Sequence, residues 1–304
     1  MEMTKSLVAA IRPRSLYASA APVIITWSLL RVSHDISLLR PDVIATVVVA
    51  VVVQILANLN GIYTTFHRAF DPLKATTKQG ADGENKIVIN LMSQKLVQGW
   101  SWIFFLVIMA MVGVIQLTGR RKSQHVASVF SVLAVMTFLY CRHTKPLPAV
   151  GLQEFIFAIS IGPLAMLTTS FIAIGAITGA VIVYAHIVML FALSAQILQS
   201  AADAPFAHRF GHQSTSLALR LGYQRTYQTF LLLLTASYGV LVMASLTLGH
   251  TPNLLLVLTL NRIKDMSEAF REEQLRGLPE QLATLGAILS AGVASSITVS
   301  AFIA

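Results

Sequence analysis

The sequence predicts an all-α protein that crosses a membrane several times. Of its 304 residues, 55% are hydrophobic and only 12% are charged, whereas a soluble domain usually carries about 25% charged residues. The charges occur in a few clusters, with long apolar stretches between them. About 20 apolar residues in a helix cross the hydrocarbon core, and lipid offers the backbone no hydrogen-bond partners. The apolar runs are too long for barrel strands, so we expect transmembrane helices.

The apolar stretches predict about nine helices. We place them at residues 16–31, 43–66, 96–117, 125–141, 153–174, 177–200, 226–248, 253–264 and 281–303. The eighth helix is short, and a charged amphipathic segment continues past its end. Because no low-complexity linker divides the chain, we expect residues 1–304 to form a single domain.

The basic residues predict a multi-pass integral membrane protein with a cytosolic N-terminus. In that topology 17 of the 22 lysines and arginines lie in cytosolic segments, as the positive-inside rule requires. The cluster Arg120-Arg121-Lys122 is the main departure from the rule. Loop anchoring thus explains the net charge of +9, and we expect no nucleic acid as a partner. The single cysteine, Cys141, excludes an internal disulfide.

The second predicted helix carries a stripe of polar residues. Gln54, Asn58, Gly61 and Thr65 follow one another at spacings of four, three and four, so they share one helical face. Polar side chains at bilayer depth are costly and usually face a cavity or another helix. The alternative interpretation of each polar side chain, taken singly, is that it forms a hydrogen bond to a neighbouring helix.

The sixth predicted helix and its continuation carry a similar stripe. Gln196, Ser200 and Asp203 are spaced by four and three, with Gln199 beside them and His186 further up the helix. Both stripes run toward the predicted cytosolic side, so a shared cavity is our preferred interpretation. His186 by itself is also compatible with a buried neutral imidazole bonded to a carbonyl.

Short motifs occur in order along nearly the whole chain. They are Arg12-Pro13-Arg14, Gln54 with Asn58, Arg68 with Asp71, Gly83-Glu84-Asn85-Lys86, Lys145-Pro146-Leu147-Pro148, Gly151-Leu152-Gln153-Glu154, Gly162-Pro163, Asp203, and Leu217-Ala218-Leu219-Arg220-Leu221-Gly222. In this order they resemble the UbiA superfamily, and within it the dihydroxynaphthoate prenyltransferases of the menaquinone branch. The resemblance implies a UbiA-type bundle around a central apolar cavity.

The resemblance also implies a chemistry that this sequence has partly lost. The family transfers an isoprenyl group from its diphosphate to an aromatic acceptor, and two aspartate motifs bind the magnesium that stabilises the leaving diphosphate. Here Asn58 is followed by Ile62 and Thr65 at the expected aspartate positions, and Asp203 is followed by Ala207. With these degenerate motifs we expect no paired magnesium site and no cofactor.

Three functions remain open. The first is a cyclase of specialised (secondary-metabolite) metabolism that folds a long terpenoid or polyketide substrate for ring closure, using proximity and orientation. The alternative is an aromatic prenyltransferase, a transferase with a relocated or single Mg2+ held by Asp71 and Asp203. The second alternative is a non-catalytic lipid-binding or scaffold homologue. The expected partners are the lipid bilayer and a hydrophobic small-molecule substrate, with protein partners left open.

The candidate site residues combine the polar stripes with positions that match the family. The catalytic candidates are Asp203, as an acid or hydrogen-bond donor, with Asn58, Tyr63, His67 and Tyr140 as orienting groups. The candidate substrate-binding residues are Gln54, Thr65, Arg68, Lys86, Lys145, His186, Gln196, Gln199 and Ser200. Among these, Arg68 and Lys86 are the candidates for anion contact.

Overall fold

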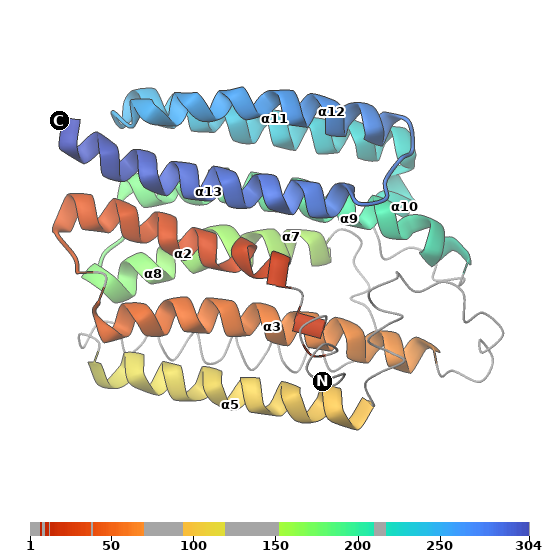
Figure 1. Ribbon diagram of the computed structural model, residues 1–304, viewed down its shortest axis with the longest axis horizontal. Coiled ribbons are helices and arrows are strands. Elements are labelled where there is room, and N and C mark those ends of the chain that lie inside the picture. The colour runs from red at the N-terminus through yellow and green to blue at the C-terminus, as the bar shows by residue number, and fades with distance from the viewer. Residues whose placement is uncertain are drawn as a thin grey trace. The chain divides into compact units, whose positions relative to one another are not determined.

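The protein is helical throughout the part of the chain that the structure describes. A computed structural model describes residues 7, 10, 11, 13–37, 39–69, 94–118, 152–209 and 217–303. Every regular element in these ranges is a helix (Figure 1). Five helical stretches are long and apolar enough to cross a membrane: Lys95–Thr118, Glu154–Ile174, Gly179–Ala202, Tyr223–Thr247 and Leu278–Phe302. The predicted all-α membrane fold is therefore confirmed.

The helices agree with most of the predicted positions. They are α2 (Pro13–His34), α3 (Pro41–Ala69), α5 (Gln94–Thr118), α7 (Leu152–Ile159), η1 (Ser160–Leu164), α8 (Ala165–Ile174), α9 (Gly179–Arg209), α10 (Leu217–Leu221), α11 (Tyr223–Thr247), η2 (Thr251–Thr259), α12 (Leu260–Arg271) and α13 (Leu278–Ile303). The predicted helix at 125–141 lies outside the described residues. The cytosolic N-terminus stays a prediction.

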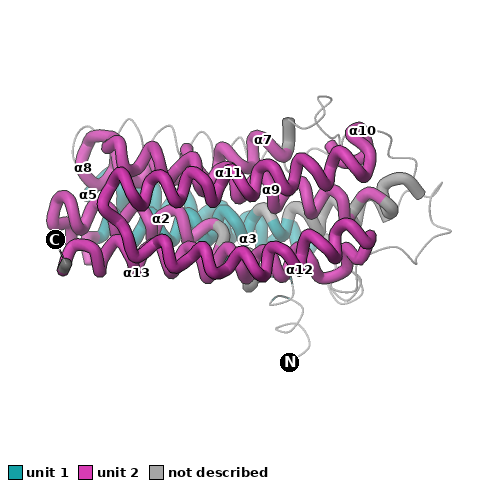
Figure 2. Tube along the Cα trace, turned by 90° about the horizontal axis from the view of Figure 1, so that it is seen from above, with its two compact units in different colours: residues 1–16, 41–146 teal, residues 17–40, 147–304 magenta. Residues whose placement is uncertain are grey.

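The chain forms two compact units, which are coloured separately in Figure 2. The first comprises residues 1–16 and 41–146, and the second residues 17–40 and 147–304. In the first unit α3 packs along α5, with Ile55, Leu59 and Val97 buried between them. The valine-rich start of α3 is helical although valine favours strands in water, because a helix satisfies its own backbone hydrogen bonds.

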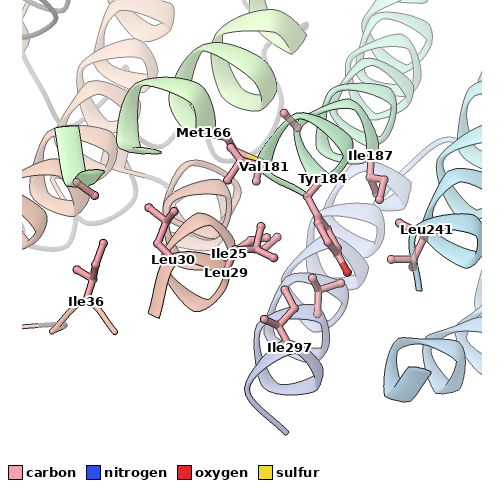
Figure 3. Close-up of a cluster of buried hydrophobic side chains, with 14 residues drawn as sticks. Ile25, Leu29, Leu30, Ile36, Met166, Val181, Tyr184, Ile187, Leu241 and Ile297 are labelled. Atoms are coloured by element: carbon pink, nitrogen blue, oxygen red, sulfur yellow. The ribbon is translucent and has the colours of Figure 1, made fainter. Parts of the chain in front are cut away.

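In the second unit, α9 is the helix on which the others assemble. It packs against α7, η1, α8, α10, α11 and α13. One apolar cluster joins Ile25 of α2, Met166 of α8, Tyr184 of α9, Leu241 of α11 and Ile297 of α13 (Figure 3). A second cluster lies further along α9, where Leu198 meets residues of α11, α12 and α13.

The predicted helix at 153–174 is interrupted by a π-helical turn. Residues Ser160–Leu164 form η1 and contain Pro163, whose ring removes a backbone donor and disturbs the α-helical ladder. Gly162 in this turn lies directly against α9: a Cβ atom there would stand 2.8 Å from the Met189 nitrogen and 2.9 Å from the Ala185 oxygen. Glycine thus permits the close backbone approach of η1 and α9.

The predicted helix at 253–264 is helical throughout, but its type changes along the segment. Residues Thr251–Thr259 form the 3₁₀ helix η2, and the amphipathic helix α12 begins directly after it at Leu260. Ile263, Met266 and Phe270 form the buried face of α12. Its contact with α11 includes a 3.0 Å hydrogen bond between the Tyr227 hydroxyl and Ser267 Oγ. The charged segment is therefore a docked helix with an apolar face, as its spacing of three and four requires.

A buried polar cluster joins α9 to the start of η2. Asn253, which is fully buried, donates from Nδ2 to the Tyr184 hydroxyl at 2.8 Å. The same hydroxyl lies 2.8 Å from His250 Nδ1. A hydroxyl oxygen can accept two hydrogen bonds, so which of Tyr184 and His250 donates depends on the tautomer of the histidine. Burial lowers the pKa of His250, which favours the neutral ring.

We predict that Gly162→Ala destabilises the protein by about 1–3 kcal/mol, the usual cost of overpacking. The added methyl group would collide with the backbone of α9 and not with a movable side chain. The free energy of unfolding, measured by denaturant titration in detergent, tests this. Gly239→Ala is the matched control, because a Cβ at this exposed helical position meets no atom within 4 Å. Equal stability of the two variants would contradict the close approach.

We also predict that stability falls as the pH falls below about 6.5, the ordinary value for histidine. Because the folded-state pKa of His250 is lowered, the unfolded chain binds more protons in this range, and the loss continues until the pH reaches the folded-state value. Melting temperatures of His250→Gln should vary less with pH than those of the wild type. His34→Gln, at an exposed histidine, should retain the full dependence.

Candidate functional site

The predicted site residues lie in two polar groups, one on α3 in the first unit and one around α9 in the second. On α3, Gln54 Nε2 donates to Asn58 Oδ1 at 3.1 Å, which confirms that these two residues share a helical face. Asn58 Nδ2 then donates to the backbone oxygen of Ile11 at 2.7 Å. Both ends of the Asn58 amide are thus used inside the protein, where they fasten the N-terminal segment to α3.

The rest of the α3 stripe follows the same helix. Tyr63, Thr65, His67 and Arg68 are helical residues of α3, and their side chains lie outside the described part of the structure. The remaining candidates of the neighbouring loops lie outside the described residues altogether: Asp71, Lys86, Tyr140 and Lys145. Their roles stay predictions.

Around α9, the structure brings Ser200 together with a residue that was not among the candidates. Ser200 Oγ donates to Oε1 of Glu154, the acidic residue in the first turn of α7, at 2.8 Å. The backbone nitrogen of Leu217, the first residue of α10, donates to the same oxygen at 3.2 Å. Glu154 therefore connects α7, α9 and α10 through one carboxylate oxygen.

The other oxygen of this carboxylate is different. The Glu154 side chain is only 5% exposed, and its Oε2 is buried without a hydrogen-bond partner. A buried polar group left in this state costs about 1–3 kcal/mol. In the described part of the chain no lysine, arginine or histidine forms an ion pair with Glu154. Oε2 is therefore a buried acceptor that needs a partner.

The remaining candidates on α9 have separate positions. Gln196 and Gln199 are half-buried, and Asp203 is helical, three residues after Ser200, with its side chain outside the described part. His186 is exposed, and its Nδ1 lies 2.8 Å from the carbonyl oxygen of Ile182 in the same helix. The predicted carbonyl contact of His186 is confirmed, but the predicted burial is wrong because the residue is exposed. Its proposed contact with substrate stays a prediction.

Local structure fixes where Leu217 presents its amide. The five-residue helix α10 ends at Gly222, which has φ 75° and lets the chain turn directly into α11. A side chain at this position would be strained. Thr226 Oγ1 donates to the Gly222 carbonyl at 2.8 Å and closes the turn. The turn and Glu154 thus hold the two ends of α10.

Sequence reasoning missed Glu154, although a signal was present. It is the only acidic residue of the span Glu154–Ile174. A lone acidic residue in the first turn of a helix commonly stabilises the helix dipole. This explanation is sufficient for Glu154 from the sequence alone, so it gives no reason to expect the hydrogen bonds to other helices. Its partners Ser200 and Leu217 are 46 and 63 residues away, so no local pattern identifies them.

The absence of a paired magnesium site stays a prediction from the sequence. Mg2+ prefers carboxylate oxygens, and the resemblance to the family puts Ile62, Thr65 and Ala207 at three of the four aspartate positions. The Asn58 amide is already bonded at both ends, to Gln54 and to the Ile11 carbonyl. The described residues include no group of three or more His, Cys, Asp or Glu that could hold a metal. We therefore derive no step through magnesium.

Comparison with known proteins gives a clear result at the level of the fold. No family model matches the sequence, and no curated protein is significantly similar to it. Among solved structures, the chain is similar to a UbiA homolog from Archaeoglobus fulgidus bound to GPP and Mg2+, with a TM-score of 0.67, 14% identity, and 98% of this chain and 99% of that chain covered.

Two further solved structures agree. The apo UbiA homolog from Aeropyrum pernix K1 matches with a TM-score of 0.65 and 15% identity, over 94% of this chain and 97% of that one. A digeranylgeranylglyceryl phosphate synthase matches with a TM-score of 0.56 and 14% identity, over the whole length of both chains. The chain therefore has the fold of UbiA homologues over essentially its full length.

We predict that Asn58→Ala releases the N-terminal segment from α3. The change leaves the Ile11 carbonyl without its donor and Gln54 without its acceptor, with a cost of about 1–3 kcal/mol. Hydrogen exchange should become faster at residues 7–16. Thr118→Ala in α5 is the control, because Thr118 is exposed and its hydroxyl bonds only the Val114 carbonyl of its own helix. Unchanged exchange in Asn58→Ala would contradict the anchoring role.

Proposed function

We propose that this chain is an intramembrane enzyme of the UbiA superfamily that acts on a long hydrophobic substrate, isoprenoid or polyketide, and closes a ring in it. The observation that carries the proposal is the full-length likeness to a UbiA homolog bound to GPP and Mg2+. A fold that binds GPP in one protein is a suitable scaffold for a related substrate in another. The low identity makes the substrate class a proposal.

The substituted aspartate positions favour ring closure over ionisation of a diphosphate. Ile62 and Ala207 offer no ligand atoms, and Thr65 offers only a neutral oxygen. Without paired cations, the negative charge of a leaving diphosphate has little stabilisation. A reaction that begins with protonation of a carbon–carbon double bond, or a pericyclic closure, does not create that charge.

In this mechanism the protein folds the substrate and supplies a proton. The apolar chamber holds the reacting carbons near each other, which removes part of the entropic barrier. A carboxyl group donates a proton to one double bond, and a second double bond attacks the resulting cation to form the ring. The carboxylate left by the first step then accepts a proton from a carbon next to the new cation, which forms a double bond and restores the acid. Asp203 is the proposed donor, and Tyr63, His67 and Tyr140 would orient polar groups of the substrate. The Asn58 amide is instead bonded to Gln54 and to the Ile11 carbonyl.

Prenyl transfer to an aromatic acceptor is the second candidate. It is favoured by the solved UbiA homologues bound to GPP or DMAPP with Mg2+ and by the retention of Asp203. In this case Asp71 and Asp203 would hold a single or relocated metal ion. The two candidates share the hydrophobic substrate and differ in their need for magnesium.

The need for magnesium is the test that separates them. We expect purified protein in detergent, mixed with prenyl diphosphates and aromatic acceptors, to release no diphosphate that depends on Mg2+, so that EDTA has no effect. A ring closure that starts with a proton and ends with its loss yields an isomer of unchanged mass, detected by its retention time. Release of diphosphate that requires Mg2+ would contradict the ring-closure proposal and support prenyl transfer.

The role of Asp203 has its own test. In an assay that follows formation of the isomer, Asp203→Asn should lower the rate by about 100-fold or more, the usual contribution of a positioned acid. Asp265→Asn, at an exposed aspartate of α12, should retain the wild-type rate. Full activity of Asp203→Asn would exclude Asp203 as the proton donor.

A further inference from the structure

Glu154 is a buried carboxylate that neither proposed reaction uses. Only its Oε1 is bonded, by Ser200 Oγ at 2.8 Å and by the Leu217 nitrogen at 3.2 Å. A carboxylate can accept about four hydrogen bonds, shared between its two oxygens. The second oxygen, Oε2, is buried and has no donor in the described part of the chain. The side chain is thus rigidly held at one oxygen and unpartnered at the other.

Burial limits the kind of partner that this oxygen would take. Oε2 is itself buried, and Ala201 and Ala218, which follow Ser200 and Leu217 in sequence, belong to the buried apolar cluster of the second unit. In such an environment a neutral donor enters at a lower cost than an ammonium group or another cation. A hydrogen bond to a carboxylate is also stronger than one between neutral groups. A hydroxyl on an otherwise apolar molecule satisfies both conditions.

We propose that Glu154 Oε2 binds the hydroxyl group of the hydrophobic substrate, as a binding residue of the site around α9. The inference rests on the proposed function, since it takes the substrate of that function as the ligand. The hydroxyl belongs to an alcohol of an isoprenoid chain or to a phenol of an aromatic acceptor.

The position of Glu154 links this hydroxyl to the predicted site. Its partner Ser200 precedes Asp203 by three residues on α9, which is about one helical turn. A substrate whose hydroxyl is held at Glu154 is therefore fixed beside the segment of α9 that carries the retained aspartate.

The test compares pairs of ligands that differ only in the donor. The first pair is farnesol and farnesyl methyl ether, and the second is naphthol and methoxynaphthalene. In one of the two pairs we expect the hydroxyl compound to bind the wild-type protein in detergent about tenfold or more tightly than the ether, as measured by calorimetric titration. A preference in the first pair identifies an isoprenoid alcohol, and a preference in the second identifies a phenol. Equal affinities within both pairs would overturn the proposal.

Glu154→Gln is the decisive variant. Its amide oxygen can still accept from Ser200 and Leu217, so the fold is retained, while an amino group replaces Oε2. This group donates equally well to an alcohol and to an ether, so the preference for the hydroxyl should disappear while the ether still binds. The alcohol and the ether partition differently into detergent. Comparing the ratio of their affinities between the wild type and Glu154→Gln cancels this difference.

Glu280→Gln is the matched control, because Glu280 is exposed and also lies in the first turn of its helix, α13. This variant should retain the preference for the hydroxyl compound.

Two results for Glu154→Gln would overturn the proposal. Equal weakening of alcohol and ether would indicate a structural role alone, and an unchanged preference for the hydroxyl would indicate an internal water at Oε2. Diphosphate release that requires Mg2+, together with a retained phenol preference, would overturn only the proposed ring closure.

Discussion

The constraint on which this structure depends is that a membrane interior offers polar groups no partner except the protein itself. The described helices meet it locally: Thr26 and Ser245, both buried, return their hydroxyl hydrogens to the carbonyls of Pro22 and Leu241 four residues earlier. Between helices, Ser237 of α11 donates to the Ile187 carbonyl of α9 at 3.1 Å. These hydrogen bonds within the protein explain most of the polar residues of the apolar helices. A buried polar atom without such a bond is therefore a candidate for a function.

Three buried side-chain atoms in the described ranges have no partner: Trp27 Nε1, Asn253 Oδ1 and Glu154 Oε2. Asn253 is nevertheless bonded through its amino group to Tyr184. Glu154 differs because it is acidic and because its other oxygen is fixed by two helices. Many of the other buried polar residues meet the constraint through bonds within the protein, and the carboxylate of Glu154 beside Ser200 meets it at only one oxygen. This difference is why we propose a substrate contact at Glu154.

The sequence was sufficient for the fold class and for local faces, because both depend on composition and spacing. The spacing of Gln54 and Asn58 predicted that they share a face, and their hydrogen bond confirms it. Composition did not predict the π-turn around Pro163 or the 3₁₀ geometry of η2, since the hydrophobicity of a segment is the same for both helix types. The bonds from Asn58 to Ile11 and from Ser200 to Glu154 join distant residues, and spacing carries no information about such pairs.

We propose that a UbiA-type fold here serves a hydrophobic substrate without a paired metal site. The most direct measurement is the number of Mn2+ ions, as paramagnetic substitutes for Mg2+, that the purified protein binds in the presence of geranyl diphosphate, followed by electron paramagnetic resonance. The account predicts no protein-dependent binding beyond that of the diphosphate alone, in the wild type and in Asp203→Asn alike. Tight binding of Mn2+ by the wild type that is lost in Asp203→Asn would contradict it.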